Sequence, residues 1–290
     1  MGELRGTLYV VATPIGNLGD VTLRAIETLR AVPLIAAEDT RITRRLLDRY
    51  EITTRTISYH AQSGPARERD LLEHLASGAD LALVTDAGTP VVSDPGEGLI
   101  AAWAAAGGVV VAIPGASSVL AAVASAGIAG PRWSFEGFLP RSGRERRERL
   151  AAIAADGRGT VLFEAPPRLA ATLRDLAAAC GADRPGAVCR ELTKLHEQVA
   201  RGTLGELVSL TADGSIPARG EVVLVVGWAM EAADAAADGP AARDGALVVA
   251  KAEVERLVTA GTARGEAAKR VAAATGIPRR ALYGTGGLGD

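Results

Sequence analysis

The first 115 residues alternate short apolar runs with segments of helical periodicity, and this alternation limits the possible folds more than any other feature of the chain. The apolar runs have the length of strands, and they are Thr7–Thr13, Leu34–Glu38, Arg55–Tyr59, Asp80–Thr85 and Val109–Ile113. The helical segments between them are Val21–Ala31, Ile42–Tyr50, Arg67–Ala76 and Glu97–Ala106. Strands that alternate with helices build a mainly parallel sheet covered by helices. We therefore predict an α/β domain over residues 1–116.

A second α/β pattern follows the glycine-containing passage Gly127–Pro131. Its expected helices are Arg144–Ala155 and Arg168–Cys180. Its expected strands are Gly159–Phe163, Gly186–Arg190 and Val222–Val226. The pattern predicts a second α/β domain over residues 117–230.

The last 60 residues have a different character. Residues 231–245 are rich in Ala, Asp and Gly and show little periodicity, which is typical of a linker. Residues 246–290 carry two amphipathic helical stripes, and Gly276-Ile277-Pro278 turns into the basic pair Arg279-Arg280. Short helices around a tight turn resemble a helix-turn-helix unit. A nucleic-acid contact and a solvated helical tail are both compatible with this segment.

Composition excludes several classes of protein. The chain is 48% hydrophobic and 23% charged, as in globular proteins, and its net charge of −2 gives no overall attraction for nucleic acid. Its two cysteines, Cys180 and Cys189, form no CxxC pair, so we expect neither a metal site nor a disulfide framework. No apolar run has membrane-spanning length, and the N-terminus lacks the apolar stretch of a secretory signal. We therefore expect a cytoplasmic protein without a membrane partner.

The loop after the fourth predicted strand is the strongest candidate for a binding site. It reads Thr85-Asp86-Ala87-Gly88-Thr89-Pro90 and continues to Ser93-Asp94-Pro95-Gly96. Small residues and acids at the carboxyl end of a parallel strand place backbone amides and carboxylates where open α/β folds bind small molecules.

Loops after the first and fifth predicted strands have a similar composition. Gly16 and Gly19 in the loop Pro14–Asp20 permit close backbone approach, and Asp20 is well placed to cap the next helix. Gly-x-Gly-x-x-Gly is absent here, which argues against a nicotinamide or flavin site. Ser117 and Ser118 follow the fifth strand, where hydroxyls at a helix N-terminus can contact a ligand or simply cap the helix.

Charged residues cluster after two other strands. Glu38, Asp39 and Arg41 follow the second strand, and Arg190–Glu197 contains Glu191, Lys194 and His196. Unpaired buried charge is costly, so these side chains must pair, cap a helix, face solvent or line a cleft. We favour a cleft for both groups, with a charged solvated turn as the alternative for the second.

Taken together, these motifs resemble the tetrapyrrole methylase superfamily, the class III S-adenosylmethionine-dependent methyltransferases. The motifs that carry the resemblance are Pro14–Asp20, Ala37–Arg41, Asp86–Pro90 with Ser93–Gly96, Ile113–Gly115, Phe135–Pro140 and Arg190–Lys194 with His196-Glu197. They cover most of residues 7–228 in the family's order. The loop Asp-Ala-Gly-Thr-Pro stands where the tetrapyrrole-modifying relatives typically carry Gly-Asp-Pro, which places the chain nearer to the branch that methylates ribosomal RNA.

The resemblance implies two α/β domains of the tetrapyrrole methylase type with S-adenosyl-L-methionine in the cleft between them, a small C-terminal helical domain and a homodimer. It implies 2′-O-methylation of a cytidine in 16S ribosomal RNA, free or in the small ribosomal subunit. A tetrapyrrole or protein substrate, and a non-catalytic RNA-binding role, are the alternatives. Carried over by position, the donor-binding residues are Pro14, Asp86, Thr89, Ser117, Ser118, Phe163, Glu221 and Val222.

The catalytic residues are less well defined by the resemblance. A neutral ribose hydroxyl is a poor nucleophile, so a base or a cation that lowers its pKa should assist the reaction. The candidate bases are Glu38, Asp39, Glu191 and His196. The candidate cations, which could also anchor phosphates, are Arg41, Arg190 and Lys194.

A basic segment at the start of the second unit is a candidate RNA contact. Its arginines are Arg141, Arg144, Arg146, Arg147 and Arg149. Phosphate contacts supply most of the sequence-independent affinity for nucleic acid. Because Glu145 and Glu148 are interleaved with these arginines, a solvated helix face is an equal alternative.

Overall fold

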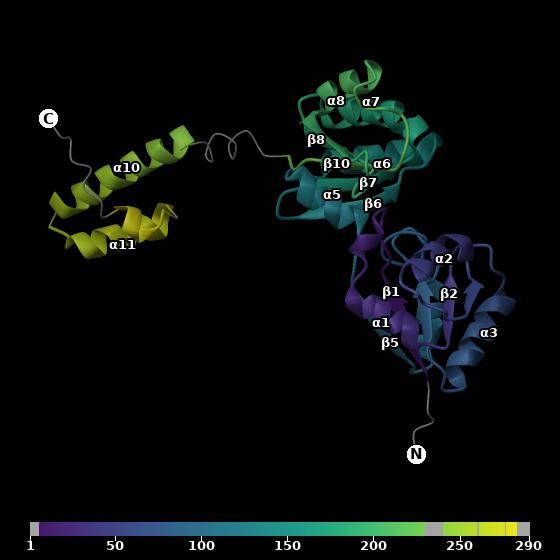
Figure 1. Cartoon of the computed structure of the whole chain (residues 1–290). Helices are drawn as coiled ribbons and strands as arrows, with labels where there is room; N and C mark the ends of the chain where they lie inside the picture. Colours follow the sequence, from purple (N-terminus) through teal and green to yellow (C-terminus); the bar gives the residue numbers. More distant parts are fainter. Residues whose placement is uncertain (1–5, 230–239, 260, 276, 283–290) are drawn as a thin grey trace. The chain divides into compact units, whose positions relative to one another are not determined.

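The computed structural model describes residues 6–229, 240–259, 261–275 and 277–282, and side chains from residue 247 onward in the last part. The chain forms two compact units, Met1–Ala229 and Met230–Asp290 (Figure 1). The first unit contains two five-stranded sheets. The second unit is helical.

The first sheet is parallel throughout and has the strand order β3-β2-β4-β1-β5. Its strands are β1 (Thr7–Val11), β2 (Leu34–Ala37), β3 (Thr56–Ser58), β4 (Leu81–Val84) and β5 (Val109–Ile113). The helices that connect them are α1 (Leu23–Ala31), α2 (Thr40–Arg49), α3 (Pro65–Ala76) and α4 (Glu97–Ala105).

Alternate residues of these strands face two separate hydrophobic cores. On one face, Leu29 of α1 and Leu47 of α2 pack against a set of strand residues that includes Val84. On the other face, α3 and α4 cover the strand residues that alternate with these, and Leu99 of α4 belongs to the same hydrophobic cluster as Leu83 of β4. Helices α1 and α4 therefore leave the neighbouring strands β1 and β4 toward opposite faces. Such a switch point opens a crevice at the carboxyl ends of the two strands, where α/β proteins bind ligands.

The second sheet is mixed and has the order β6-β7-β10-β8-β9. Its strands are β6 (Trp133–Phe138), β7 (Gly159–Glu164), β8 (Pro185–Arg190), β9 (Gln198–Thr203) and β10 (Val222–Val226). Only β6 and β7 pair in parallel, and the other neighbours are antiparallel.

Helices cover both faces of the second sheet (Figure 1). On one face lie α6 (Gly143–Ala155), α7 (Leu169–Cys180) and α8 (Leu204–Ala212). On the other lies α5 (Ser118–Ala126). The central strand β10 is apolar at every position, because Val222 and Leu224 face the first group of helices and Val223 faces α5. Continuous apolar strands of this kind are the ones that sequence predicts best.

The sequence-based prediction missed two strands of this sheet and one helix that covers it. Strand β6 contains Ser134, Glu136 and Gly137, and β9 contains Arg201 and Gly202. Both strands lie at an edge of the sheet and are only partly buried, so neither has a continuous apolar run. Helix α8 follows β9 directly and was missed with it.

The second unit consists of α10 (Pro240–Thr259), α11 (Arg264–Thr275) and the short 3-10 helix η3 (Arg279–Leu282). Its core contains Val254, Val271 and Leu282. Helix α10 begins inside the segment 231–245 whose composition predicts a linker, and residues 231–239 of that segment lie outside the described residues, as does Gly276 of the predicted turn. No helix in the described part of the chain is both long enough and apolar enough to cross a membrane.

Candidate active site

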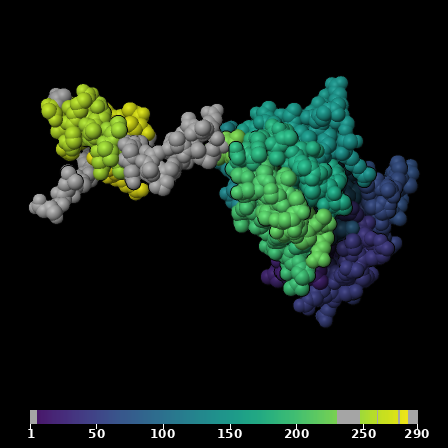
Figure 2. All heavy atoms as spheres, turned by 90° about the horizontal axis from the view of Figure 1, so that it is seen from above, coloured from purple at the N-terminus to yellow at the C-terminus, as the bar shows by residue number. Residues whose placement is uncertain are grey.

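A cavity of about 360 Å³ lies where the carboxyl end of the first sheet meets the second sheet. We call the part of this unit that contains the first sheet its first half (purple to blue) and the part that contains the second sheet its second half (teal to green). The two halves pack directly against each other (Figure 2). From the first half, the lining residues are Ile15 after β1, six residues of the segment Ala87–Asp94 after β4, and Ser117, Ser118 and Val119 after β5. From the second half, they are Phe138, Phe163, Glu164, Ala165, Pro166, Cys189, Leu192, Gly220, Glu221, Val222 and Val223.

Gly88 joins the three loops of the first sheet. Its N–H and carbonyl exchange hydrogen bonds of 3.0 and 2.8 Å with Thr13, just beyond β1. A Cβ at Gly88 would lie 3.4 Å from Cγ2 of Ile15, and its φ of +82° favours glycine. The neighbouring Thr89 hydroxyl donates to the carbonyl of Ala116 at 3.4 Å. The backbone therefore fixes the walls of the cavity on this side.

An acidic cluster lies behind the loop after β4. The carboxylate of Glu38 accepts hydrogen bonds from the Thr85 hydroxyl at 2.6 Å and from the Asp86 N–H at 3.2 Å. The carboxylate of Asp86 accepts a bond from the Asp39 N–H at 2.9 Å. Burial, reinforced by Glu38 and Asp86, raises the pKa of Asp94 to about 6. Asp94 is the member of this cluster that lines the cavity.

Asp39 and Arg41 form an ion pair at the start of α2. The Asp39 side chain caps the helix by accepting from the Arg41 N–H at 2.8 Å, and the Arg41 guanidinium lies 2.5 Å from the same carboxylate. The hydrogen bond from the Arg41 side chain lowers the pKa of Asp39 to about 2. Neither residue lines the cavity, and the Arg41 side chain is 88% exposed.

Lys194 connects the two halves at the edge of the cavity. Its Nζ lies 2.9 Å from Oε1 of Glu191 and 2.9 Å from Oε1 of Glu221. Its aliphatic chain lies against Gly16, in the loop after β1. Burial alone would lower the pKa of Lys194, but the hydrogen bonds to Glu221 and Glu191 outweigh burial and raise that pKa. The charge of Lys194 therefore joins the 191–197 loop to Glu221 of the same half, while its aliphatic chain forms the contact with the loop after β1; we call this arrangement the Lys194 clamp.

Three aromatic rings cluster on the second sheet beside the cavity. Phe163 meets Phe135 edge-on, with ring centroids 4.9 Å apart, and meets Phe138 at 5.5 Å in a tilted arrangement. Phe163 and Phe138 line the cavity, and Phe138 is 55% exposed. Such rings offer flat apolar surfaces on which a heterocycle can stack.

The lining contains most of the residues that sequence proposed for donor binding. They are Thr89, Ser117, Ser118, Phe163, Glu221 and Val222. Pro14 and Asp86 do not line the cavity themselves, although each precedes a residue that does. Ser117 also caps α5, since its side chain accepts from the Leu120 N–H at 3.4 Å.

The six catalytic candidates are placed differently, because none of them lines the cavity. Glu38, Asp39 and Arg41 lie behind the β4 loop, and Glu191 and Lys194 form the clamp. His196 is exposed, and its carbonyl accepts a bond from Arg190, which is buried and therefore not placed to anchor a phosphate.

Two further expectations were wrong. Thr22 caps α1 by accepting from the Ala25 N–H, so Asp20, which lies in the short helix η1 (Leu18–Asp20), does not. Arg146 of the basic segment is 8% exposed and pairs with Asp175, so it is neither a solvated residue nor free for RNA. Asp94 and Phe138 also line the cavity; both belong to motifs that carry the family resemblance, but neither was among the predicted site residues.

Comparison with known proteins agrees with this architecture. Residues 7–208 match the family model of the tetrapyrrole (corrin/porphyrin) methylases. Two relatives are named ribosomal RNA small subunit methyltransferase I. The one from Synechocystis sp. is 45% identical over 96% of both chains. The one from Bacillus subtilis is 40% identical over 96% of this chain and 93% of its own.

The chain belongs to the tetrapyrrole methylase family, in the group of ribosomal RNA small subunit methyltransferase I. Solved structures of the tetrapyrrole methylases share its fold. Cobalt precorrin-4 methyltransferase, a cobalamin biosynthetic enzyme, has a TM-score of 0.60 at 18% identity and covers 78% of this chain and 96% of its own. Uroporphyrin-III C-methyltransferase from Thermus thermophilus, complexed with S-adenosyl homocysteine, has a TM-score of 0.55 at 18% identity, covering 77% of this chain and 97% of its own.

Proposed function

We propose that this protein uses S-adenosyl-L-methionine to methylate the 2′-hydroxyl of a cytidine in 16S ribosomal RNA. The observation that carries the proposal is the cavity between the two sheets, in a chain 45% identical to a ribosomal RNA small subunit methyltransferase I. The cavity lies at the switch point of a parallel sheet, which is the usual ligand site of such folds.

The lining suits the proposed methyl donor. The cavity volume of about 360 Å³ is within the range of small-molecule sites. Phe163, Leu192 and Val222 offer apolar surface for the adenine ring, and the hydroxyls of Thr89 and Ser117 offer hydrogen bonds for the polar groups. Every lining residue is described, and the lining includes three carboxyl groups but no Lys, Arg or His. Because Glu164 and Glu221 already pair with Arg168 and Lys194, Asp94 is the lining carboxyl group whose charge can favour a cationic sulfonium ligand.

When bound, S-adenosyl-L-methionine supplies a methyl group already activated by the positive charge on its sulfur. The residues of this chain then have two tasks. They hold the ribose hydroxyl in line with that methyl group, and they accept the proton of the hydroxyl. Alignment alone can contribute about 7–11 kcal/mol to a reaction of this kind. The rigid loops joined at Gly88 and the clamp at Lys194 provide such alignment.

Asp94 is our choice for the proton acceptor. Among the three lining carboxyl groups, the side chain of Glu164 is fully buried and already binds Arg168 and Thr172. Glu221 is paired with Lys194. Asp94 remains, and its pKa of about 6 suits a general base near neutral pH. We assign Glu38 a positioning role, because it binds Thr85 and Asp86 behind this loop.

The test is transfer of a labelled methyl group to small ribosomal subunits, to protein-free 16S RNA, to a porphyrinogen and to a protein mixture. We expect label in RNA, at a phosphodiester that resists alkaline hydrolysis, since a 2′-O-methyl group blocks attack by that oxygen. Label in the porphyrinogen or in protein, or alkali-sensitive label in RNA, would refute the proposal. Calorimetry with S-adenosyl-L-methionine separates an enzyme from a non-catalytic RNA-binding homologue.

We also propose that the protein acts as a homodimer in the cytoplasm, where its ribosomal substrate is made. Exposed apolar side chains support a self-association surface, among them Leu195, which is 94% exposed at the tip of the 191–197 loop. Sedimentation of the protein and of Leu195→Asp would test whether this loop belongs to the interface.

A further inference from the structure

A bulge in strand β6 places Phe138, a largely exposed aromatic ring, in the wall of the cavity. The pairing of β6 with β7 shifts register between Phe135 and Phe138, and Gly137 between them has a φ of +61°. In a regular strand, residues three apart point to opposite faces. Here both Phe135 and Phe138 contact the ring of Phe163. Bulges beside active sites commonly re-aim a side chain in this way.

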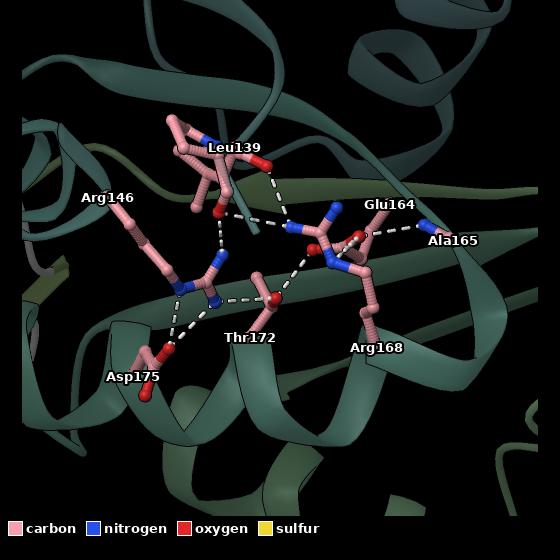
Figure 3. A network of polar contacts seen from close by, with 8 residues as sticks. Leu139, Arg146, Glu164, Ala165, Arg168, Thr172 and Asp175 are labelled. Carbon is pink, nitrogen blue, oxygen red and sulfur yellow. Dashed lines mark hydrogen bonds and ion pairs between the residues drawn. The ribbon is translucent and has the colours of Figure 1, made fainter. Parts of the chain in front are cut away.

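A buried polar network holds the chain immediately after Phe138 (Figure 3). Arg168 donates to the carbonyl of Leu139 at 2.7 Å, and Arg146 donates to the carbonyl of Pro140 at 2.9 Å. Arg146 is held in turn by Asp175 at 2.7 Å and by the Thr172 hydroxyl at 2.9 Å.

The same network reaches the wall of the cavity through Glu164. Its carboxylate binds Arg168 at 3.2 Å, the Ala165 N–H at 2.8 Å and the Thr172 hydroxyl at 2.5 Å. Burial of these charges is tolerated because each has several partners. The segment that carries Phe138 is therefore fixed before any ligand binds.

Phe138 stays 55% exposed despite this support, which is unusual for a large apolar ring. Phe163 is partly buried within the same wall and can serve the adenine of the methyl donor. A second ring at the open side has free surface for a larger substrate. Arg141 follows it by three residues and is exposed, and the structure describes no ion pair for it.

We infer that Phe138 is the stacking platform for the target nucleobase of an unpaired RNA segment, with Arg141 beside it to hold a neighbouring phosphate. This inference rests on the proposed function and adds the residue that receives the substrate. Sequence-specific recognition of RNA mostly targets unpaired segments, whose bases stack on aromatic side chains and whose backbone is held by arginine contacts.

The test compares Phe138→Ala and Phe138→Trp with wild type in small-subunit methylation. Val109→Ala is the matched control, because Val109 is also apolar and 56% exposed but lies at the amino end of β5. Loss of one stacking contact is expected to raise KM for small subunits about 5- to 150-fold. The Trp variant and the control should stay near wild type. The dissociation constant of S-adenosyl-L-methionine, measured by calorimetry, should stay at the wild-type value in the control and should change far less than KM in Phe138→Ala, whose ring contacts Phe163.

Two results would overturn the inference while the proposed function stands. If Phe138→Ala weakens S-adenosyl-L-methionine binding and leaves KM for subunits unchanged, the ring stacks on the methyl donor instead. If it changes neither quantity, the ring contacts no ligand. A wild-type protein that transfers no methyl group either to small subunits or to protein-free 16S RNA would reject the proposed function, and the substrate role of Phe138 with it.

Discussion

The side chain of Lys194 lies so close to Gly16 that a Cβ atom on that glycine would come within 2.5 Å of Lys194 Cγ. Gly16 follows β1, whereas Lys194 belongs to the loop after β8, so this contact joins the two halves of the unit at the cavity. The ammonium group is at the same time held by Glu191 and Glu221. A side chain at position 16 would therefore displace Lys194 from this position.

Gly16→Ala should displace Lys194 and weaken S-adenosyl-L-methionine binding. The cost of such overpacking is about 1–3 kcal/mol, or roughly a 5- to 150-fold rise in the dissociation constant if it falls wholly on binding. Gly19→Ala is the control in the same loop, since its added Cβ would come no closer than 3.2 Å, to Oδ1 of Asn17. If Lys194 is the obstacle, Lys194→Ala should remove most of the effect of Gly16→Ala in a double-mutant cycle. Additive effects would show that the contact is unimportant.

Asp94→Asn should abolish most of the turnover. Removal of a general base typically costs about 10²- to 10⁴-fold in rate. The change is nearly isosteric, so the affinity for S-adenosyl-L-methionine should stay within a few-fold of wild type by calorimetry. Because the pKa of Asp94 is about 6, wild-type kcat/KM should rise with pH through that value.

Asp39→Asn provides the comparison for this experiment, because Asp39 is ionised above a pKa of about 2 and does not line the cavity. It should leave the rate and the pH profile unchanged. Wild-type turnover in Asp94→Asn would exclude Asp94 as the base.

The parts of this site that sequence predicts are those fixed by topology alone. The strands of the first sheet were predicted to within two residues at each end, and β5 with its observed bounds. Because these strands are parallel, their carboxyl ends necessarily share one edge of the sheet. Thr89 and Ser117 follow such strands and do line the cavity. Their placement required only strand order and direction.

The residues that sequence did not single out depend on local backbone conformations that no periodicity reveals. The segment before Asp94 includes Val91 and Ser93 at φ of +67° and +70°, which is rare for residues other than glycine and a strain for a β-branched valine. Phe138 owes its direction to the bulge in β6. The charged residues were predicted to line a cleft, and this failed for a related reason. Asp39 and Arg190 form hydrogen bonds with local partners, Arg41 and Gln198, instead of facing the cavity.

The raised pKa of Asp94 also predicts how stability changes with pH. The folded state holds this proton up to about pH 6, whereas the ordinary pKa is 3.8. Stability from this group is therefore present below about pH 4 and is lost as the pH rises through 6. Asp94→Asn should be more stable than wild type at pH 8 by about 1–2 kcal/mol, allowing for partial exposure of the group. At pH 4 the difference should largely vanish. Urea unfolding at the two pH values measures it, and equal differences at both would contradict the shift.

Arg146→Ala tests the network of Figure 3 directly. The substitution removes the hydrogen bonds from the Arg146 guanidinium to the Pro140 carbonyl and to the Thr172 hydroxyl, together with the ion pair to Asp175. Arg168 still donates to the Pro140 carbonyl at 3.3 Å, so the loss is that of the bonds made by Arg146 alone. Hydrogen bonds to a charged group contribute about 1.5–3 kcal/mol each, and a loss of roughly 2–4 kcal/mol in the free energy of unfolding is expected. Arg147→Ala, next to it on α6, removes an exposed side chain and should change stability by less than about 0.5 kcal/mol. Similar effects of the two variants in urea unfolding would show that Arg146 is not a structural residue.

Arg141→Ala should weaken binding of small subunits through a phosphate contact. The loss should depend on salt, because each neutralised phosphate of single-stranded RNA contributes about −0.7 to the slope of log K against log salt concentration. The variant should therefore show a shallower slope by about that amount, with S-adenosyl-L-methionine binding unchanged. Arg144→Ala is the matched comparison, since Arg144 already pairs with Glu148 at 2.5 Å and should contribute less. An unchanged slope in Arg141→Ala, or an equal change in Arg144→Ala, would remove Arg141 from the RNA path.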